Sequence, residues 1–320
     1  MILTVSLNPA VDYVVFGDSF MVGETNRGED IAPDPGGKGN NAARIAHALG
    51  AEVQATGMAG GFTGAFIEDS LRAEGIRPDF YRTSGATRIT ASFIDKESLR
   101  QTKIVPYGLT VSSTEIEGFC QHFDKLLRSG NHSMVSMNGS LARGMDAEGY
   151  LDLIKLCNER NLPVILDTSG PALAAVVSQP GNTVRPYMIK PNIQEARALC
   201  GVGDSVSVEE VVALLRPFLD SVPCIALTLG AEGAILLSKE ESLRGFIPAV
   251  AAVNPICAGD AFIGGFLAAW DQRPGDVKNC FRWALAAGSA TASVKGLMWE
   301  RKLFDELLDR VEIRSLRRGA

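Results

Sequence analysis

The chain has 320 residues, of which 46% are hydrophobic and 21% charged, with a formal net charge of −6. This length fits one large α/β domain, or a domain with a small appendage, and the acidic balance gives little support to nucleic-acid binding. The six cysteines show no C-x-x-C spacing and there are three histidines, which disfavours zinc and favours buried thiols in a reducing cytoplasm. No segment is typical of a signal peptide or a membrane span.

Apolar runs of strand length alternate along the chain with segments of helical period. Strands are predicted at 2–7, 52–60, 134–139, 163–168, 187–192, 224–230 and 234–238. Helices are predicted at 40–50, 65–75, 149–160 and 194–201, and from about Asp260 onward. This alternation predicts a mostly parallel sheet that is covered by helices on both faces.

Two stretches, 10–35 and 87–108, break this rhythm because they are rich in strand signals and poor in helix signals. They predict a small separate sheet over one end of the main sheet. No long linker, repeat or low-complexity tract divides the chain. We therefore expect a single domain over 1–320, with these two stretches inserted in it.

Ligands of such sheets bind beyond the carboxyl ends of the strands, where three glycine-containing segments fall. The first is PGGKGNNAARIA, 35–46. Its glycines leave N–H groups free at a helix start, where the helix dipole and Lys38 favour an anion. Asp12, after the first strand, suits sugar hydroxyls. A glycine-rich helix entry without a ligand is the alternative, and Gly39 after Lys38 excludes a Walker A loop.

The other two segments are TLGAEGAILL, 228–237, and NPICAGDAFIGGF, 254–266. The first predicts a strand, a glycine turn and a second strand, which a plain hairpin explains equally well. In the second, small residues open an apolar helix and leave N–H groups for an anion. Asp260 there is either an N-cap or a general base that takes a proton from an attacking hydroxyl.

In this order the motifs resemble those of the PfkB (ribokinase-like) carbohydrate kinases. GGKGNNAARIAHALG is similar to the N-terminal signature, IKPNIQEA to the lysine-proline-asparagine stretch, TLGAEGA to the nucleotide turn and NPICAGDAFIGGF to the C-terminal signature. The resemblance runs from about residue 1 to 310. LTVSLNPAVD, GETNRG, TRIT and VILDTSG look most like the hexose-phosphate branch, which contains 1-phosphofructokinase, tagatose-6-phosphate kinase and the minor 6-phosphofructokinase.

The resemblance implies a three-layer α/β/α ribokinase-like sandwich with a small β-sheet lid, which also forms a homodimer contact. It implies a cytoplasmic enzyme that uses ATP and Mg²⁺ to phosphorylate a ketohexose phosphate, most like fructose 1-phosphate to fructose 1,6-bisphosphate. Tagatose 6-phosphate and fructose 6-phosphate are alternative substrates, and another sugar or a nucleoside is a further one. A catalytically weak, sugar-phosphate-binding regulator with the same fold is a third possibility, and a monovalent-ion requirement stays open.

The same resemblance assigns roles to individual residues. Asp12, Gly36, Gly37 and Asn41 would hold the sugar hydroxyls. Lys38 and Arg88 would face the substrate phosphate, with Arg27 a weaker candidate. Asn192 and Glu195 would organise Mg²⁺ and its waters, with Lys190 nearby. Thr228, Gly230 and Gly233 would line the nucleotide phosphates, and helix 280–291 the adenine. Cys257, Ala258 and Gly259 would bind the transferring phosphoryl group, and Asp260 would be the general base.

Cys257 departs from the family's pattern, which usually has glycine at this position. A cysteine keeps its N–H donor but tolerates a positive φ poorly. Its thiol, at a helix N-terminus beside cations, is predicted to have a lowered pKa. Pro255, Ala142 and Lys103 (where the branch often has glutamate) are further departures, which bear on substrate choice and catalytic speed more than on fold.

Overall fold

The structure, a computed structural model, describes residues 1–30, 32–98, 100–179, 184–247, 250 and 257–316. Residues 254–256 of the C-terminal signature, Pro255 among them, lie outside the described residues. Within these described ranges, the main sheet contains ten strands: β1 (Ile2–Ser6), β5 (Val53–Gly60), β6 (Arg77–Thr83), β9 (Met134–Asn138), β10 (Val164–Asp167), β11 (Met188–Ile189), β12 (Cys224–Thr228), β13 (Ala234–Ser238), β14 (Ser242–Phe246) and β15 (Glu312–Ser315).

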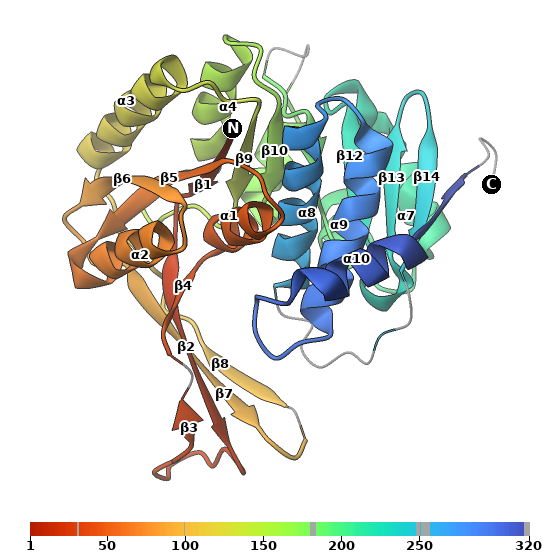
Figure 1. Cartoon of the computed structure of the whole chain (residues 1–320). Coiled ribbons are helices and arrows are strands. Elements are labelled where there is room, and N and C mark those ends of the chain that lie inside the picture. Colours follow the sequence, from red (N-terminus) through yellow and green to blue (C-terminus); the bar gives the residue numbers. More distant parts are fainter. Residues whose placement is uncertain (31, 99, 180–183, 248–249, 251–256, 317–320) are drawn as a thin grey trace.

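The strand order in this sheet is β15-β14-β13-β12-β11-β10-β9-β1-β5-β6 (Figure 1). All pairings from β12 to β6 are parallel, whereas β13, β14 and β15 add to one edge as antiparallel strands. The β1 sequence ILTVS is buried at every position, as expected for a strand covered on both faces. The predicted mostly parallel sheet is confirmed.

Helices cover both faces of the sheet and enclose two hydrophobic cores. One layer holds α1 (Lys38–Ala48), α2 (Gly61–Ala73), α8 (Ala258–Gln272), α9 (Val277–Ala292) and α10 (Arg301–Arg310). The other holds α3 (Ser113–Ser129), α4 (Gly149–Asn158), α5 (Gly170–Val177), α6 (Ile193–Cys200) and α7 (Val208–Leu215). The predicted three-layer sandwich is therefore confirmed. Among the described residues, no helix combines the length and apolarity that a membrane span requires.

A second sheet projects from the main body and is called the lid below (Figure 1). Its strands are β2 (Ala10–Gly17), β3 (Glu29–Asp30), β4 (Asp34–Gly36), β7 (Arg88–Asp95) and β8 (Gln101–Ile104). They lie in the order β3-β2-β7-β8, and β4 also pairs with β2. The two stretches predicted to form a small sheet are thus the two that build it.

Side chains at two places join the lid to the main body. Arg44 of α1 is buried and donates to Asp34 of β4 at 3.2 Å and to Glu74 at 2.8 Å. Lys295, which follows α9, lies 5.7 Å from the centre of the Phe16 ring in β2. The lid therefore contacts both α1 and the segment after α9.

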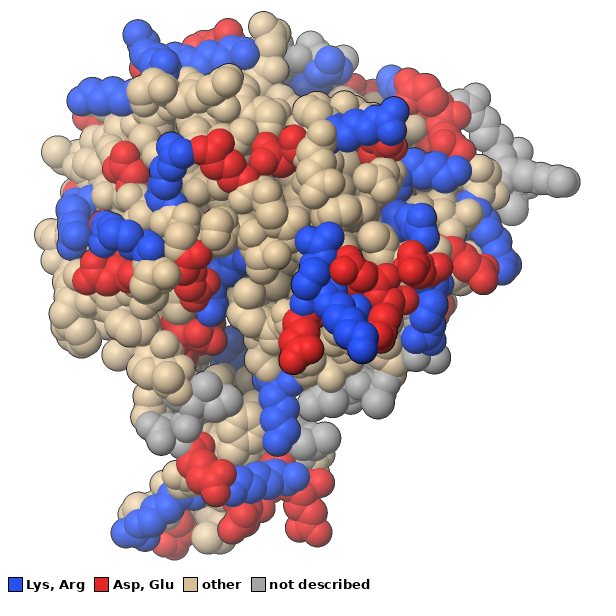
Figure 2. Space-filling model, in the orientation of Figure 1, with Lys and Arg blue, Asp and Glu red and all other residues tan. Residues whose placement is uncertain are grey.

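Basic and acidic side chains are interspersed over the face seen in Figure 2, on the main body and on the lid alike. A mixed surface of this kind suits solubility more than the binding of a polyanion such as nucleic acid. Any charge selection of a small ligand must therefore come from local groups at its site.

Candidate active site

A cavity of about 690 Å³ lies at the carboxyl ends of the parallel strands, beside the N-terminus of α8. Its polar lining includes Lys38, Asp167, Lys190, Asn192, Glu195, Thr228, Ser289 and Asp260, and its other lining residues include Gly230, Gly233, Cys257, Ala258, Gly259, Phe262, Leu285, Gly288 and Ala292. Four of the predicted motifs therefore meet around one space. The α9 residues in this lining lie on the helix expected to approach adenine.

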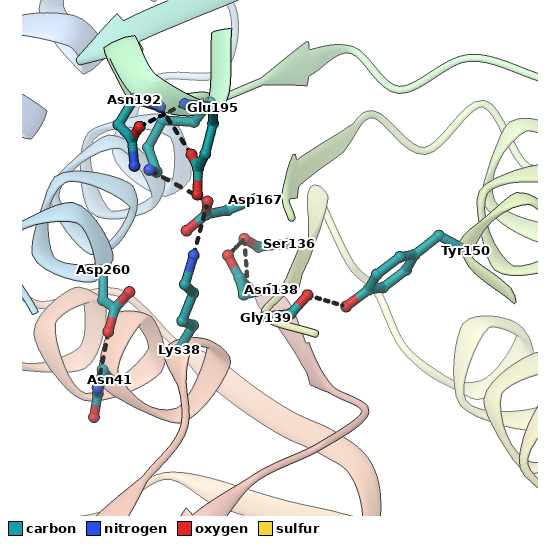
Figure 3. A network of polar contacts seen from close by, with 11 residues as sticks. Lys38, Asn41, Ser136, Asn138, Gly139, Tyr150, Asp167, Asn192, Glu195 and Asp260 are labelled. Atoms are coloured by element: carbon teal, nitrogen blue, oxygen red, sulfur yellow. Dashed lines mark hydrogen bonds and ion pairs between the residues drawn. The ribbon is translucent and has the colours of Figure 1, made fainter. Parts of the chain in front are cut away.

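Asp167, the last residue of β10, is the centre of an ion-pair network (Figure 3). Its Oδ1 lies 3.2 Å from Nζ of Lys190 and 3.4 Å from Nζ of Lys38. Asp167 is 1% exposed and Lys190 5% exposed, so each buried charge is offset by the other. The strand end is fixed further because Gly139 donates its N–H to the Asp167 carbonyl. The network holds two cations at fixed positions beside the cavity.

The charges around Lys38 keep it protonated. Burial alone would lower the pKa of Lys38, but the carboxylates of Asp167, Asp260 and Glu195 raise it, and the net direction is upward. A cation that stays charged in a partly buried position is suited to neutralise phosphate oxygens.

Asp260 is the third residue of α8, and the N-cap of this helix is Cys257, so the N-cap interpretation of Asp260 is wrong. Its carboxylate is buried and accepts a hydrogen bond from Asn41 Nδ2 at 2.9 Å. Burial and the neighbouring charge of Asp167 raise its pKa to about 6, against the Asn41 hydrogen bond and two lysines. A carboxylate with a pKa near the working pH is suited to general-base catalysis.

The first turn of α8 offers an anion site next to this carboxylate. N–H groups in the first turn of a helix have no partner within the helix, and the helix dipole adds positive potential there. A Cβ atom on Gly259 would lie 3.5 Å from Nζ of Lys190, so the ammonium group approaches the same turn. The Ala258 and Gly259 N–H groups and Lys190 can therefore converge on one phosphoryl group.

Cys257 adopts a left-handed conformation with φ 63° and ψ 0°. This is the conformation that a glycine would adopt without a steric penalty, and for cysteine it stores strain of about 1–3 kcal/mol. Burial raises the pKa of the thiol well above its usual range, and the charges of Asp260 and Asp12 add to that direction. The predicted lowering of this pKa is wrong, because burial outweighs the nearby positive potential.

Asn192 and Glu195 form a capping box at the start of α6. Glu195 N–H donates to Asn192 Oδ1 at 2.8 Å, and Asn192 N–H donates to Glu195 Oε2 at 2.9 Å. Both side chains nevertheless line the cavity, close to Asp167 in Figure 3. Their spacing is thus explained by helix capping and leaves oxygen atoms available to a ligand.

A divalent cation fits this part of the cavity. Asp167 Oδ2 is buried and has no hydrogen-bond partner in the described structure. Within the described residues, no group of three or more His, Cys, Asp or Glu is arranged to hold a metal. Mg²⁺ is commonly bound through one or two carboxylates, waters and substrate phosphates, which is what Asp167, Glu195 and an ATP molecule could supply.

The nucleotide turn joins β12 and β13 as an antiparallel pair, as predicted. Gly230 has φ 61° and Gly233 φ 84°, so both positions favour glycine. Thr228, at the end of β12, donates its N–H to Pro191 at 3.0 Å, and this bond joins the turn to the segment before Asn192. The turn and that segment therefore form one wall of the cavity.

The N-terminal signature GGKGNN, residues 36–41, lies where the lid meets α1. A Cβ atom on Gly36 would lie 2.1 Å from Oδ2 of Asp12, so only glycine allows this carboxylate its position. Gly37 has φ 104°, which also favours glycine. Burial raises the pKa of Asp12. Asn41 links this region to the start of α8, because its amide donates to both Asp260 and, at 3.3 Å, Cys257 Sγ.

The three predicted phosphate-binding cations have different surroundings. Lys38 pairs with Asp167, whereas Arg88, at the base of the lid, donates to the carbonyls of Asn8 at 3.2 Å and Pro106 at 3.0 Å. Arg27 lies exposed between β2 and β3, and the described contacts do not join it to the cavity. Of these three cations, Lys38 lines the cavity and Arg88 lies at the base of the lid.

A family model described as pfkB family carbohydrate kinase matches residues 5–299. The chain belongs to the pfkB family. Its fold and this match make it an ATP-dependent sugar kinase, and several of its structural neighbours are named phosphofructokinases.

Solved structures of the pfkB kinases named phosphofructokinase superimpose on nearly the whole chain. The Staphylococcus aureus "putative phosphofructokinase" is 27% identical, with a TM-score of 0.81 and 99% of each chain covered. The Thermotoga maritima "possible 1-phosphofructokinase" is 23% identical, with a TM-score of 0.88 and 99% and 100% covered. Escherichia coli phosphofructokinase-2 with substrates and products is 23% identical, with a TM-score of 0.86 and 97% and 98% covered.

The sequence did not predict Asp167, the centre of the ion-pair network in the cavity of this pfkB kinase. Its signal was present, because it ends a buried strand at the edge where ligands bind. The sequence also did not predict which residues of the helix expected to approach adenine would face the ligand. In the structure, this helix brings Leu285, Gly288, Ser289 and Ala292 to the cavity.

Proposed function

We propose that this kinase transfers the γ-phosphoryl group of ATP to a hydroxyl of a ketohexose phosphate, most like a 1-phosphofructokinase. The observation that supports it best is Asp260, a buried carboxylate with a pKa raised to about 6, in the first turn of α8 beside Lys190. A carboxylate next to an anion site is electrostatically costly, and proton abstraction from an acceptor hydroxyl gives it a task there.

Asp260 would accept the proton of the acceptor hydroxyl as its oxygen bonds to the γ-phosphorus. The bond from that phosphorus to the bridging oxygen breaks, and ADP leaves with the electron pair. The Ala258 and Gly259 N–H groups and Lys190 would stabilise the charge on the transferring group. Asn41 orients the carboxylate through its 2.9 Å hydrogen bond.

Asp167, Asn192 and Glu195 would hold Mg²⁺ and its waters at the phosphate side of the cavity. When bound, the ion neutralises negative charge on the phosphates of ATP. The lid would cover the sugar and exclude water, which limits wasteful hydrolysis of ATP.

The choice of substrate rests on the sugar side. Asp12 suits sugar hydroxyls, and Arg88 supplies a guanidinium group whose Nε is buried without a partner among the described residues. Escherichia coli phosphofructokinase-2, a relative of this chain, has been solved with fructose 6-phosphate. These features support a phosphorylated ketohexose, of which we propose fructose 1-phosphate over fructose 6-phosphate and tagatose 6-phosphate.

A substrate panel tests this proposal. ADP release with MgATP is measured against fructose 1-phosphate, fructose 6-phosphate, tagatose 6-phosphate, fructose and ribose. We expect at least one sugar phosphate to exceed both unphosphorylated sugars about 100-fold or more in kcat/KM, since a phosphate bound by charge-assisted hydrogen bonds contributes that much. If ribose or fructose is the better substrate, the assignment to a sugar phosphate is wrong. Sugar-phosphate binding without turnover would instead indicate a regulator.

We also propose that the lid joins two copies of this chain and that the protein works in the cytoplasm. Large apolar side chains are exposed on the lid strands and their flanks: Phe20, Met21, Val22, Ile89, Ile104, Val105 and Tyr107. Such a patch favours a protein contact. Sedimentation equilibrium should give twice the 34.1 kDa of one chain, and a monomer at micromolar concentration would contradict the contact. All six cysteines are free, which supports a reducing compartment.

A further inference from the structure

The lid carries a further cation, Lys103, on the face that covers the sugar side. In a sheet, residues directly opposite one another point to the same face, and so do residues two apart on one strand. Asp12 of β2 lies opposite Thr90 of β7, and Ser92, two residues on, lies opposite Lys103 of β8. Asp12 and Lys103 therefore share one face of the lid.

This shared face is the inner one. Phe16 has the same parity as Asp12 along β2, and its ring contacts Lys295 of the main body. Both Asp12 and Lys103 lie close enough to Cys257 to act on the charge state of its thiol. Lys103 thus extends from the lid toward the N-terminus of α8.

Lys103 has no ion-pair partner among the described residues, unlike Lys96 of the same lid, which pairs with Glu29 at 3.1 Å. Arg88, on the same face, also lacks a carboxylate partner there, and its Nε is buried without any partner. Asp12 lies between these two cations, and both lower its pKa against the stronger effect of burial. Two cations left without carboxylate partners around a hydroxyl-binding group are typical of a phosphate site.

We propose that Lys103 determines specificity by binding, together with Arg88, the phosphate that the acceptor sugar already carries. The proposal rests on the proposed function and adds to it, because Lys38 is engaged with Asp167 and is not the second cation for this phosphate. Lys103 is exposed in the present arrangement, and the bound sugar phosphate would cover it when the lid lies over the site. An unphosphorylated sugar would leave both cations without a phosphate group to bind.

Lys103→Gln and Lys103→Glu test this role, with Lys96→Gln as the matched control. Using the best sugar phosphate of the panel, we expect Lys103→Gln to lower kcat/KM about 10- to 100-fold, through KM. Lys103→Glu should lower it further, while KM for ATP and kcat stay within about twofold. Lys96→Gln should behave as the wild type. Calorimetric titration with the same sugar phosphate should show the same loss of affinity without turnover.

A second background separates contact with phosphate from an effect through Asp12. If Lys103 only neutralises Asp12, Lys103→Gln should change nothing in an Asp12→Asn protein, and that result would overturn the proposal. A persistent loss of sugar-phosphate affinity in that background supports it. If Lys103→Gln leaves the affinity for the sugar phosphate unchanged while sugar phosphates remain the preferred substrates, the proposed role of Lys103 is wrong and the proposed function stands. Failure of the wild type to use any sugar phosphate would overturn the proposed function instead.

Discussion

Replacing Asp260 with asparagine should lower kcat about 10²–10⁴-fold while ATP and the sugar phosphate still bind, because removal of a general base typically has an effect of this size. The change keeps the shape of the side chain, and the new amide can still accept the Asn41 hydrogen bond through its oxygen. Steady-state kinetics with a coupled ADP assay gives kcat, and calorimetry gives both affinities. A variant that retains more than about a tenth of kcat would remove Asp260 from the catalytic role.

The protein should also remain folded after this change. The pKa of Asp260 is raised to about 6 in the folded state, above its ordinary value of 3.8. The folded chain therefore binds more protons than the unfolded chain between these values, and the ionised carboxylate reduces stability above pH 6. At pH 7.5 Asp260→Asn removes this cost, so its Tm should equal or exceed that of the wild type.

Cys257→Gly is the matched control in the same loop. Glycine adopts φ 63° without steric strain, and the backbone N–H is kept. We expect kcat to stay equal or rise, since the carboxylate is untouched and the loop loses a Cβ and a sulfur atom. A folded Cys257→Gly protein without activity would show that the thiol has a role of its own, and the loss in Asp260→Asn could then not be assigned to the base alone.

Replacing Asp167 with asparagine should have the largest effect on stability. Lys190 would stay 5% exposed with no carboxylate partner, and breaking a buried ion pair from one side costs about 3–5 kcal/mol. Chemical denaturation measures this change in the free energy of unfolding. Asp124→Asn, which removes a partly exposed carboxylate from two arginines outside the cavity, is the control and should cost about 1 kcal/mol or less.

The same variant should move the pH profile of the reaction. In the wild type, kcat should fall as the pH drops below about 6, because Asp260 must be ionised to accept a proton. Asp167 helps to raise that pKa, and its loss also frees Lys38 and Lys190 to stabilise the ionised form. The acid limb of kcat should therefore shift to lower pH in Asp167→Asn. An unshifted limb would mean that Asp260 is not the group that titrates.

The alternation of apolar runs with segments of helical period predicted the mostly parallel sheet and its cover of helices. The predicted elements did not include β6, α3, α5, α7 and α10. The predicted first residues of the helices are less accurate. α2 begins at Gly61 although the prediction begins at 65, because Gly61 has φ 66° and the glycines before 65 are typical of a turn. The antiparallel edge formed by β14 and β15 was not predicted, since short edge strands have little periodic signal.

The candidate site, like the fold, was predictable from the sequence only in part. Backbone features that depend on local sequence were predictable, such as the glycines at 36, 37, 230 and 233. The start of α8 was expected near Asp260 and lies at Ala258. The Asp167 network joins residues far apart in the chain, and no local pattern reveals such a pairing. The charge state of Cys257 was predicted wrongly for a related reason, because it depends on how deeply tertiary packing buries the thiol.

The lid is joined to the main body by four chain connections, which lead from β1 to β2, β4 to α1, β6 to β7 and β8 to α3. The second runs through Gly37, which has φ 104°, and the first ends at Ala10, two residues before Asp12, so two of the four lie beside the sugar site that we propose. A rotation of the lid about these two connections would change the distance between the Asp12 carboxylate and the α1 amides. If Asp12 and the α1 amides bind the sugar as we propose, the bound sugar would favour one angle of the lid, and the angle of the lid would in turn set the affinity for the sugar.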